Sequence, residues 1–474
     1  MAIYAMKNYM VNIIKPLSLI FLFVKMTMIR SLIRFGRRQF HTIVSREIIK
    51  PSSPTPSHLK TYNLSLIDQL VPDTFVPMVT FYPNTRIHGR SRSHDKTLDL
   101  KHSLSQTLTK YYPFAGRHAK VAPACIDCND NGAEFLEAST DTTLSDFLQT
   151  SQHEDLDQLF PHGLVNYNSN RGDGDHDQVI PLAVQLNHFE CGGVAVAVSL
   201  SHKVVDGSSL VHFLNDWAMM TRLCSKEQKK HEFSIDHDPK FIPFQYMNVN
   251  FTSLLLERSK DCVTRSFIFP NSKINDLKLK VKAMTEESGH PITNPTRVEV
   301  LNWILYKCAV AAATKNNSGV FKPSGVNHLI NIRGKMIESL PQKSIGNYVM
   351  AMEIVTENES ELKPESFINK LKKQKIQIQG LRNMETVFGL FSQPVVEEGQ
   401  RKLDVFYICS SFCGYPTYEI DFGWGKPVKA TLAGDLKKNS FILMDAPNGI
   451  EALVCLGKQD MAIMQNDPEL LAFL

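Results

Sequence analysis

Residues 202 to 207, with the sequence His-Lys-Val-Val-Asp-Gly, are the best candidates for acid–base chemistry. An ordinary histidine has a pKa of about 6.5, so the His202 imidazole is largely a free base at neutral pH. Such a base can take the proton of an alcohol as its oxygen attacks an acyl carbon, which is worth about 10²–10⁴ in rate. Asp206 can hold the loop in shape, and Gly207 can adopt backbone angles that other residues avoid. The spacing alone is weak evidence, because the chain has 16 histidines and a surface-loop histidine is the common alternative.

A second, distant motif is Asp-Phe-Gly-Trp-Gly at residues 421–425. The chain has three tryptophans, so Trp424 between two glycines is unusual. Asp-Phe-Gly also occurs in protein kinases, but no glycine-rich loop precedes a catalytic His-Arg-Asp in this chain, which excludes that class. By residue type alone, the motif indicates a structural turn in which Trp424 fills a gap in the core.

The residues on either side of His202 predict the elements that position it. Residues 182–187 and 194–201 alternate in character around a Gly-Gly pair, which predicts a β-hairpin. The second strand has small residues on one face, and we expect that face to lie against something bulky, such as a ligand or a second domain. Ser208 or Ser209 is expected to cap the helix that follows. The candidate base therefore lies between the end of a buried strand and the start of a helix.

The rest of the chain predicts two domains. Residues 225–248 are polar and contain prolines, and we interpret them as a linker between an N-terminal domain, 41–224, and a C-terminal domain, 249–474. The second domain has its own helix and strand signals, such as a helix around 297–313 and a strand at 452–456.

Residues 1–40 form an extension that we place outside the fold. Leu17–Val24 is a run of eight residues, apolar but for Ser18, which is far fewer than the ~20 needed to cross a bilayer. Three interpretations stay open: a secretory signal, an Arg-rich organellar transit segment best matched by 28–46, and an over-extended start with Met26 or Met28 as the true initiator. We favour the last, and expect a cytoplasmic protein with no stable membrane span, or an organellar one if the transit segment is real.

Composition excludes several classes of protein. Eight basic residues precede the first acidic one, and without them 44 basic residues face 48 acidic ones, so the body has no nucleic-acid-binding charge. Nine cysteines show no disulfide framework. Cys125 and Cys128 form a lone C-x-x-C, and the chain offers no second pair for a structural zinc site. The cysteines therefore indicate no structural zinc site. We expect no metal and no bound cofactor.

Taken together, these motifs resemble the BAHD family of plant acyl-CoA-dependent acyltransferases, and in detail its vinorine synthase-like branch. The resemblance covers nearly all of the chain from about residue 43. Beyond the two motifs it includes the stretches Pro51–Pro56, Leu64–Gln69, Tyr111–Arg117, Cys128–Asp130, Thr296–Val300, Asn331–Arg333 and Gly346–Asn347.

The resemblance implies an α/β fold with two similar chloramphenicol acetyltransferase-like domains and a solvent channel between them. Acyl-CoA and the acceptor would enter from opposite faces and meet at His202, the general base. Asp206 would point away from the substrate and pair with Arg333 as structural support. The enzyme would act as a monomer on a small-molecule alcohol, an alkaloid or a terpenoid, with acyl-CoA, expected to be acetyl-CoA, as co-substrate.

The resemblance also assigns the second motif. Asp421 is placed with His202 in the catalytic set as the acid of its loop, although such acids are usually regarded as structural. Gly423 and Trp424 are placed along the acyl-CoA channel. Two alternatives to alcohol acylation stay open: acylation of an amine, and a degenerate family member that only binds.

Three positions depart from the family pattern. Phe412 and Gly414 stand where relatives often carry tryptophan and a basic residue, and Tyr306 where relatives often carry tryptophan. These differences concern the shape of the pocket and the choice of acyl donor rather than the chemistry.

Overall fold

The computed structural model describes residues 41–84, 93–119, 124–161, 179–225, 240–241, 261–392, 403, 405–434 and 436–474. The N-terminal extension and nearly all of the expected linker lie outside this part of the chain. Within it, no helix has the length and apolar character needed to cross a bilayer.

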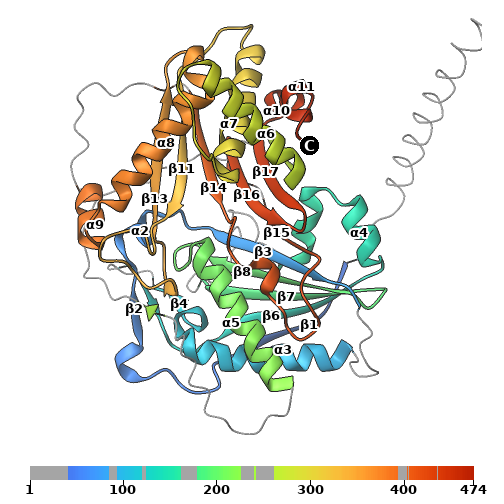
Figure 1. The fold of residues 1–474 in the computed structure, drawn as a ribbon. Helices are drawn as coiled ribbons and strands as arrows, with labels where there is room; N and C mark the ends of the chain where they lie inside the picture. Colours follow the sequence, from blue (N-terminus) through green and yellow to red (C-terminus); the bar gives the residue numbers. More distant parts are fainter. Residues whose placement is uncertain are drawn as a thin grey trace, which may run out of the picture.

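Five strands from the first half of the chain and one from its last part build a six-stranded sheet, shown in the lower part of Figure 1. Only β6 and β7 pair in parallel; the other neighbours in this sheet are antiparallel. Across the sheet, the strands are β1 (His41–Ile49), β6 (Ala133–Thr140), β7 (Leu182–Phe189), β8 (Val194–Ser201), β3 (Phe75–Tyr82) and β15 (Lys429–Leu432). The predicted hairpin is therefore confirmed as β7 and β8.

Both faces of this sheet are covered. The valines of β8 pack with the apolar sides of α3 (Ser93–Lys110) and α5 (Gly207–Ser225). On the opposite face, the small side chains of β8 lie in a cluster with Phe147 of α4 (Leu144–Thr150). The bulky groups against this small face therefore include aromatic residues of the same domain, and Ala433 of the second domain lies in the same cluster.

The second six-stranded sheet is made by the second half of the chain. Its strands in order are β10 (Cys262–Pro270), β17 (Gly449–Gly457), β16 (Ser440–Ala446), β14 (Val405–Ser411), β11 (Ser324–Asn331) and β13 (Val349–Thr356). The helices that pack against it are α6 (Asn271–Glu287), α7 (Arg297–Asn316), α8 (Pro364–Gln379) and α10 (Lys458–Met464). A capping box between Thr296 and Glu299 begins α7, close to the predicted position.

Shorter elements connect these layers. They are η1 (Ser57–Leu59), β2 (Thr61–Asn63), α2 (Leu66–Leu70), η2 (Tyr112–Ala115), β4 (Arg117–His118), β5 (Cys125–Asp127), η3 (His153–Leu159), β9 (Lys240–Phe241), β12 (Ser344–Ile345), η4 (Glu359–Leu362), α9 (Met384–Ser392), η5 (Thr417–Glu419) and α11 (Pro468–Leu471).

Sheet membership does not follow chain order throughout. The late strand β15 pairs with β3 and forms the edge of the first sheet, as Figure 1 shows. A two-residue parallel pairing of β9 with β12 adds a second link between distant parts of the chain. The two α/β domains are therefore tied together by backbone hydrogen bonds.

Candidate active site

His202 begins the turn that connects β8 to α5. Its backbone N–H donates to the carbonyl of Thr74 at 2.7 Å, which ties the turn to the segment before β3. The residue is half-buried, and its Nδ1 is shielded from solvent with no hydrogen-bond partner among the described residues. Burial lowers the pKa of the imidazole, although the backbone of the turn and the charge of Asp206 oppose this shift.

The lowered pKa of His202 predicts an acidic limb of the kcat/KM profile that lies below pH 6.5. The ring stays largely neutral at pH 6.5, the ordinary pKa of a histidine. It takes up a proton only when the pH falls through the lowered pKa of His202. Below that point, kcat/KM is expected to fall about tenfold per pH unit. Steady-state rates measured from about pH 5 to pH 8 test this, and a limb centred above pH 6.5 would contradict it.

Asp206 ends the turn and caps helix α5. Its Oδ1 accepts from the backbone N–H of Ser209 at 2.9 Å, and its carbonyl accepts from the N–H of Leu210. The expectation that Ser208 or Ser209 caps this helix is therefore wrong, because the helix begins at Gly207. An aspartate is an equally good cap, and it places a carboxylate at the positive end of the helix dipole.

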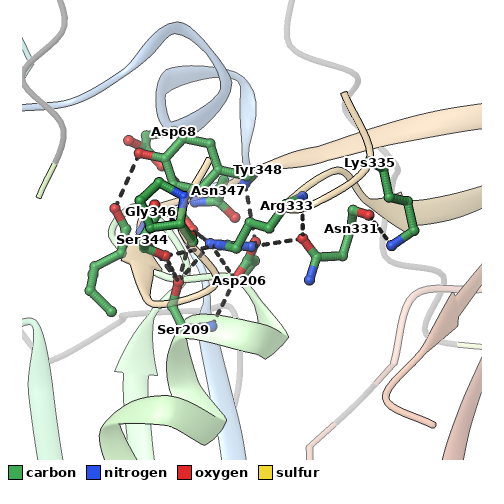
Figure 2. Close-up of polar contacts among 12 residues, drawn as sticks. Asp68, Asp206, Ser209, Asn331, Arg333, Lys335, Ser344, Gly346, Asn347 and Tyr348 are labelled. Atoms are coloured by element: carbon green, nitrogen blue, oxygen red, sulfur yellow. Dashed lines mark hydrogen bonds and ion pairs between the residues drawn. The ribbon is translucent and has the colours of Figure 1, made fainter. Parts of the chain in front are cut away.

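Arg333 brings the second domain onto this carboxylate. Its guanidinium donates twice to Asp206, at 2.6 and 3.1 Å, and both side chains are buried (Figure 2). It also donates to the carbonyls of Ser344 and Gly346 and lies over the ring of Tyr348. The pair expected from the family resemblance is present as a bidentate contact.

The charge balance of this pair favours its ionised form. Burial by itself would raise the pKa of the Asp206 carboxyl, but the Arg333 guanidinium, with the hydrogen bonds from Ser209 and Tyr348, holds it below its usual value. A buried carboxylate with this many donors has little freedom to move. Asp206 consequently faces Arg333 and the helix rather than an open site.

Gly207 has a different structural role from the one expected. It is not among the residues with positive φ. A Cβ at this position would instead lie 2.6 Å from the ring of Phe412, so the first turn of α5 needs glycine for close packing. Phe412, one of the positions that depart from the family pattern, thus packs directly beside the His202 turn.

The Asp-Phe-Gly-Trp-Gly loop is organised by the carboxylate of Asp421. Its Oδ1 accepts from the backbone N–H groups of Gly423 and Gly425, at 2.7 and 2.9 Å. Both glycines have positive φ, 98° and 94°, a conformation that other residues rarely adopt. The guanidinium of Arg222 donates to the Asp421 carbonyl. The loop conformation therefore depends on both the acid and the glycines.

The aromatic residues of this loop pack on the first domain. Phe422 is buried against Trp217 of α5, with ring centroids 4.9 Å apart. The ring of the half-buried Trp424 meets Tyr82 edge-on at 5.5 Å, and the Lys96 ammonium lies 5.2 Å from its centroid. The prediction that Trp424 fills a gap agrees with this packing, and the gap lies between strand β3 and helix α3.

The structure does not bring Asp421 close to His202. The His202 turn lies at the N-terminal end of α5, whereas Arg222, which contacts Asp421, lies fifteen residues after Gly207 in the same helix. At 1.5 Å per residue, this is a separation of roughly 22 Å along the helix axis. Between these points, Asn215 of α5 donates to the Pro416 carbonyl. The segment from Phe412 to Asp421 therefore runs along the helix.

The separation leads to a prediction for Asp421. Asp421→Asn should retain most of the stability and activity, because the amide oxygen can still accept from both glycine N–H groups. Asp421→Ala should lower the free energy of unfolding by about 0.5–1.5 kcal/mol per lost hydrogen bond. Urea unfolding and steady-state rates of the two variants provide the comparison. If the carboxylate took part in the reaction, the asparagine variant would lose as much activity as the alanine variant.

Sequence reasoning missed two buried residues, of which Asn347 contacts the His202 turn and Asp68 contacts Asn347. Asn347 donates from its side chain to the His202 carbonyl at 2.7 Å and to the carboxylate of Asp68 at 2.8 Å. Both lie in stretches that supported the family resemblance, Leu64–Gln69 and Gly346–Asn347. The sequence therefore pointed to these residues but did not indicate what they do.

Tyr306 and Gly414 are the other two departures from the family pattern. Tyr306 is buried in the second domain, where its hydroxyl hydrogen-bonds to Ser324 at 2.8 Å. Gly414 has a φ of 86°, and its N–H donates to Asp445. Tyr306 therefore contributes to the core of the second domain, and Gly414 to a turn that favours glycine.

No group of three or more histidine, cysteine, aspartate or glutamate side chains suited to a metal ion occurs in the described part of the chain. The thiols of Cys125 and Cys128 are both free.

Comparison with known proteins identifies the family. The profile of the Transferase family matches residues 41–471. Akuammiline synthase 1 from Alstonia scholaris is 38% identical over 440 residues, which span 91% of this chain and 97% of the relative. The chain belongs to this family. This is the family of the BAHD acyltransferases. The chain is therefore an acyl-CoA-dependent acyltransferase with the two-domain BAHD fold.

Two further relatives of this BAHD acyltransferase show a similar structure in one case and a different named activity in the other. The crystal structure of vinorine synthase superposes with a TM-score of 0.70 at 30% identity, covering 92% of this chain and 98% of that one. A 17,18-epoxy-17-hydroxycur-19-ene N-malonyltransferase from Strychnos nux-vomica is 35% identical, over 91% of this chain and 90% of the relative. Relatives at similar identity thus include one whose name specifies malonyl transfer to nitrogen.

Proposed function

We propose that this enzyme transfers an acetyl group from acetyl-CoA to a hydroxyl of an alkaloid or terpenoid alcohol, with His202 as the general base. One observation supports the role of His202 above the others. Its imidazole has a lowered pKa, and it lies on a turn that the Asp206–Arg333 pair and Asn347 hold from the second domain. A neutral, well-positioned imidazole is what proton abstraction from an alcohol requires.

The reaction needs no covalent enzyme intermediate. We assign the accepting atom to Nε2, because Nδ1 is shielded from solvent. Nε2 takes the hydroxyl proton while the acceptor oxygen forms a bond to the thioester carbon, and the carbonyl oxygen becomes an oxyanion. Collapse of this intermediate breaks the carbon–sulfur bond, and the protonated His202 returns the proton to the departing thiolate. Both substrates are held together, so proximity lowers part of the barrier.

We propose that the Asp-Phe-Gly-Trp-Gly loop shapes the part of the channel that takes acyl-CoA. A solvent channel between the domains would lead both substrates to His202, with Gly423 and Trp424 along the part that takes acyl-CoA. Arg222, whose side chain donates to the Asp421 carbonyl, lies roughly 22 Å along α5 from the His202 turn, and the Asp421 carboxylate is used by the loop's own N–H groups. We therefore propose that Asp421 shapes this loop and does not meet the reacting atoms.

The proposal is tested with purified protein, several acyl-CoA donors and a panel of alkaloid and terpenoid alcohols. Release of the CoA thiol that depends on the alcohol, with mass spectrometry of the ester, would support it. Absence of transfer from any donor to any alcohol, in protein that binds CoA in calorimetry, would contradict it. Comparison of acetyl-CoA with malonyl-CoA tests the donor.

Acylation of an amine is the second candidate, because a relative 35% identical to this chain is named as an N-malonyltransferase. The same imidazole could take a proton from an amine nucleophile. Competition between matched amine and alcohol acceptors for one donor distinguishes the two reactions. We further propose a cytoplasmic monomer, for which mass spectrometry of the native N terminus and light scattering are the tests.

A further inference from the structure

We propose that Asn347 is a positioning residue for the reaction, and that Asp68 anchors it. This inference rests on the proposed role of His202 as the base. Asn347 does not touch the reacting atoms; it acts on them through the backbone of the catalytic turn.

Asn347 lies in the link between β12 and β13, and its side chain is fully buried. Its Nδ2 has two hydrogens, and the structure uses both. One is donated to the His202 carbonyl at 2.7 Å and the other to Asp68 Oδ1 at 2.8 Å. The backbone N–H of Asn347 also donates to Asp68 Oδ1, at 2.8 Å. The amide therefore has one orientation that satisfies both acceptors.

Asp68 supplies a rigid anchor for this amide. It is buried within the capping box of α2, where its Oδ2 accepts from the N–H of Ser65 at 2.9 Å and its own N–H donates back to the Ser65 hydroxyl. Burial raises the pKa of the Asp68 carboxyl, while the bonds from Asn347 and Ser65 oppose that shift. Hydrogen bonds to a buried carboxylate are strong, so the amide is held firmly.

The two peptide groups of His202 are thereby fixed from opposite sides. The N–H donates to Thr74 of the first domain, and the carbonyl accepts from Asn347 of the second. With both peptide groups held, the Cα–Cβ bond has a set direction, and only the side-chain torsions remain to place the ring. A general base needs placement to within about 0.5 Å, and backbone restraint of this kind provides it.

One short segment of the second domain holds both ends of the turn. Asn347 bonds the carbonyl of His202, and the next residue, Tyr348, donates its backbone N–H to Asp206 at 3.1 Å. The preceding carbonyl, of Gly346, accepts from Arg333 (Figure 2). The Arg333 pair therefore secures the helix end of the turn, whereas Asn347 secures the histidine end, and the two functions are separable by mutation.

The test is Asn347→Ala, with activity and its pH profile measured together. We expect kcat to fall by about 10–10²-fold, because a misplacement of about 1 Å has effects of that order. The KM for acyl-CoA should change little. The acidic limb of kcat/KM should move to higher pH, since a less restrained ring is less buried and its pKa returns toward the ordinary value.

Asn302→Ala is the matched control. Asn302 is also a fully buried asparagine, and its Oδ1, like that of Asn347, has no hydrogen-bond partner among the described residues. Its Nδ2 hydrogen-bonds to His328 in the second domain, away from the His202 turn. Both variants should lose thermal stability, but only Asn347→Ala should move the pH profile. Equal kcat and equal pH profiles in the two variants would overturn the inference.

A milder variant keeps the inference testable if Asn347→Ala fails to fold. Asp68→Asn preserves the size of the anchor but removes its charge, so we expect a smaller loss of kcat with a shift of the acidic limb in the same direction. An unchanged profile in Asp68→Asn would overturn the role of the anchor. Full activity in His202→Ala would overturn the proposed base instead, so failure of the two proposals is distinguishable.

Discussion

Replacing His202 with alanine is expected to lower kcat/KM by about 10²–10⁴-fold while the fold is retained. The imidazole is the group that takes the acceptor proton, and its removal leaves water to do so. The contacts that hold the turn are made by the His202 backbone, which alanine also provides. Initial rates of CoA thiol release, with circular dichroism and thermal unfolding to check the fold, give the result.

Two further variants make this result specific. His202→Gln keeps a side chain of similar size without the basic nitrogen, and should be as inactive as the alanine variant. His290→Ala removes an exposed histidine between α6 and α7 and should have the activity of the wild-type enzyme. Parent-like rates in His202→Ala or His202→Gln would refute the assignment of the base.

Arg333→Met is expected to give the largest loss of stability, about 3–5 kcal/mol in the free energy of unfolding. The variant leaves the Asp206 carboxylate buried without its cation, and an uncompensated buried charge costs more than the pair contributes. Burial would then raise the pKa of Asp206, which at present is held low. Urea unfolding monitored by tryptophan fluorescence measures the loss.

The double variant Asp206→Asn/Arg333→Met separates the charge from the packing. Asparagine is a good helix cap and carries no charge, so the double variant should be more stable than Arg333→Met alone. A single variant that unfolds like the parent, or a double variant less stable than the single one, would show that the pair does not have this role. At neutral pH the ionised Asp206 carboxylate makes its full contribution to the stability of the wild-type protein. That contribution is lost as the pH falls through the lowered pKa of Asp206.

Local pattern was enough to locate His202. The alternation in residues 182–201 and the Gly-Gly turn predict β7 and β8, because side chains in strands alternate between faces. The end of β8 follows from the same pattern, and with it the place of His202. The capping residue could not be chosen in the same way, because Asp206, Ser208 and Ser209 are all good caps and the choice depends on where the helix begins.

Tertiary packing decided what the sequence left open. Gly207 is needed because the ring of Phe412 approaches it, a contact between residues 205 positions apart. The placement of Asp421 at the far end of α5 depends in the same way on Arg222 and Asn215, whose partners no local pattern predicts. Asn347 was visible only as part of a matching stretch, since one amide among many gives no sign of which carbonyl it binds.

The placement of β15 has a consequence for how the chain folds during synthesis. Residues 429–432 complete the first sheet by pairing with β3, whose own residues are made about 350 positions earlier. Until that late strand leaves the ribosome, one side of β3 has unpaired N–H and C=O groups and can pair with other chains. A fragment that stops before residue 429 is therefore expected to aggregate, and chaperones that cover strand edges should bind the nascent protein until translation nears its end.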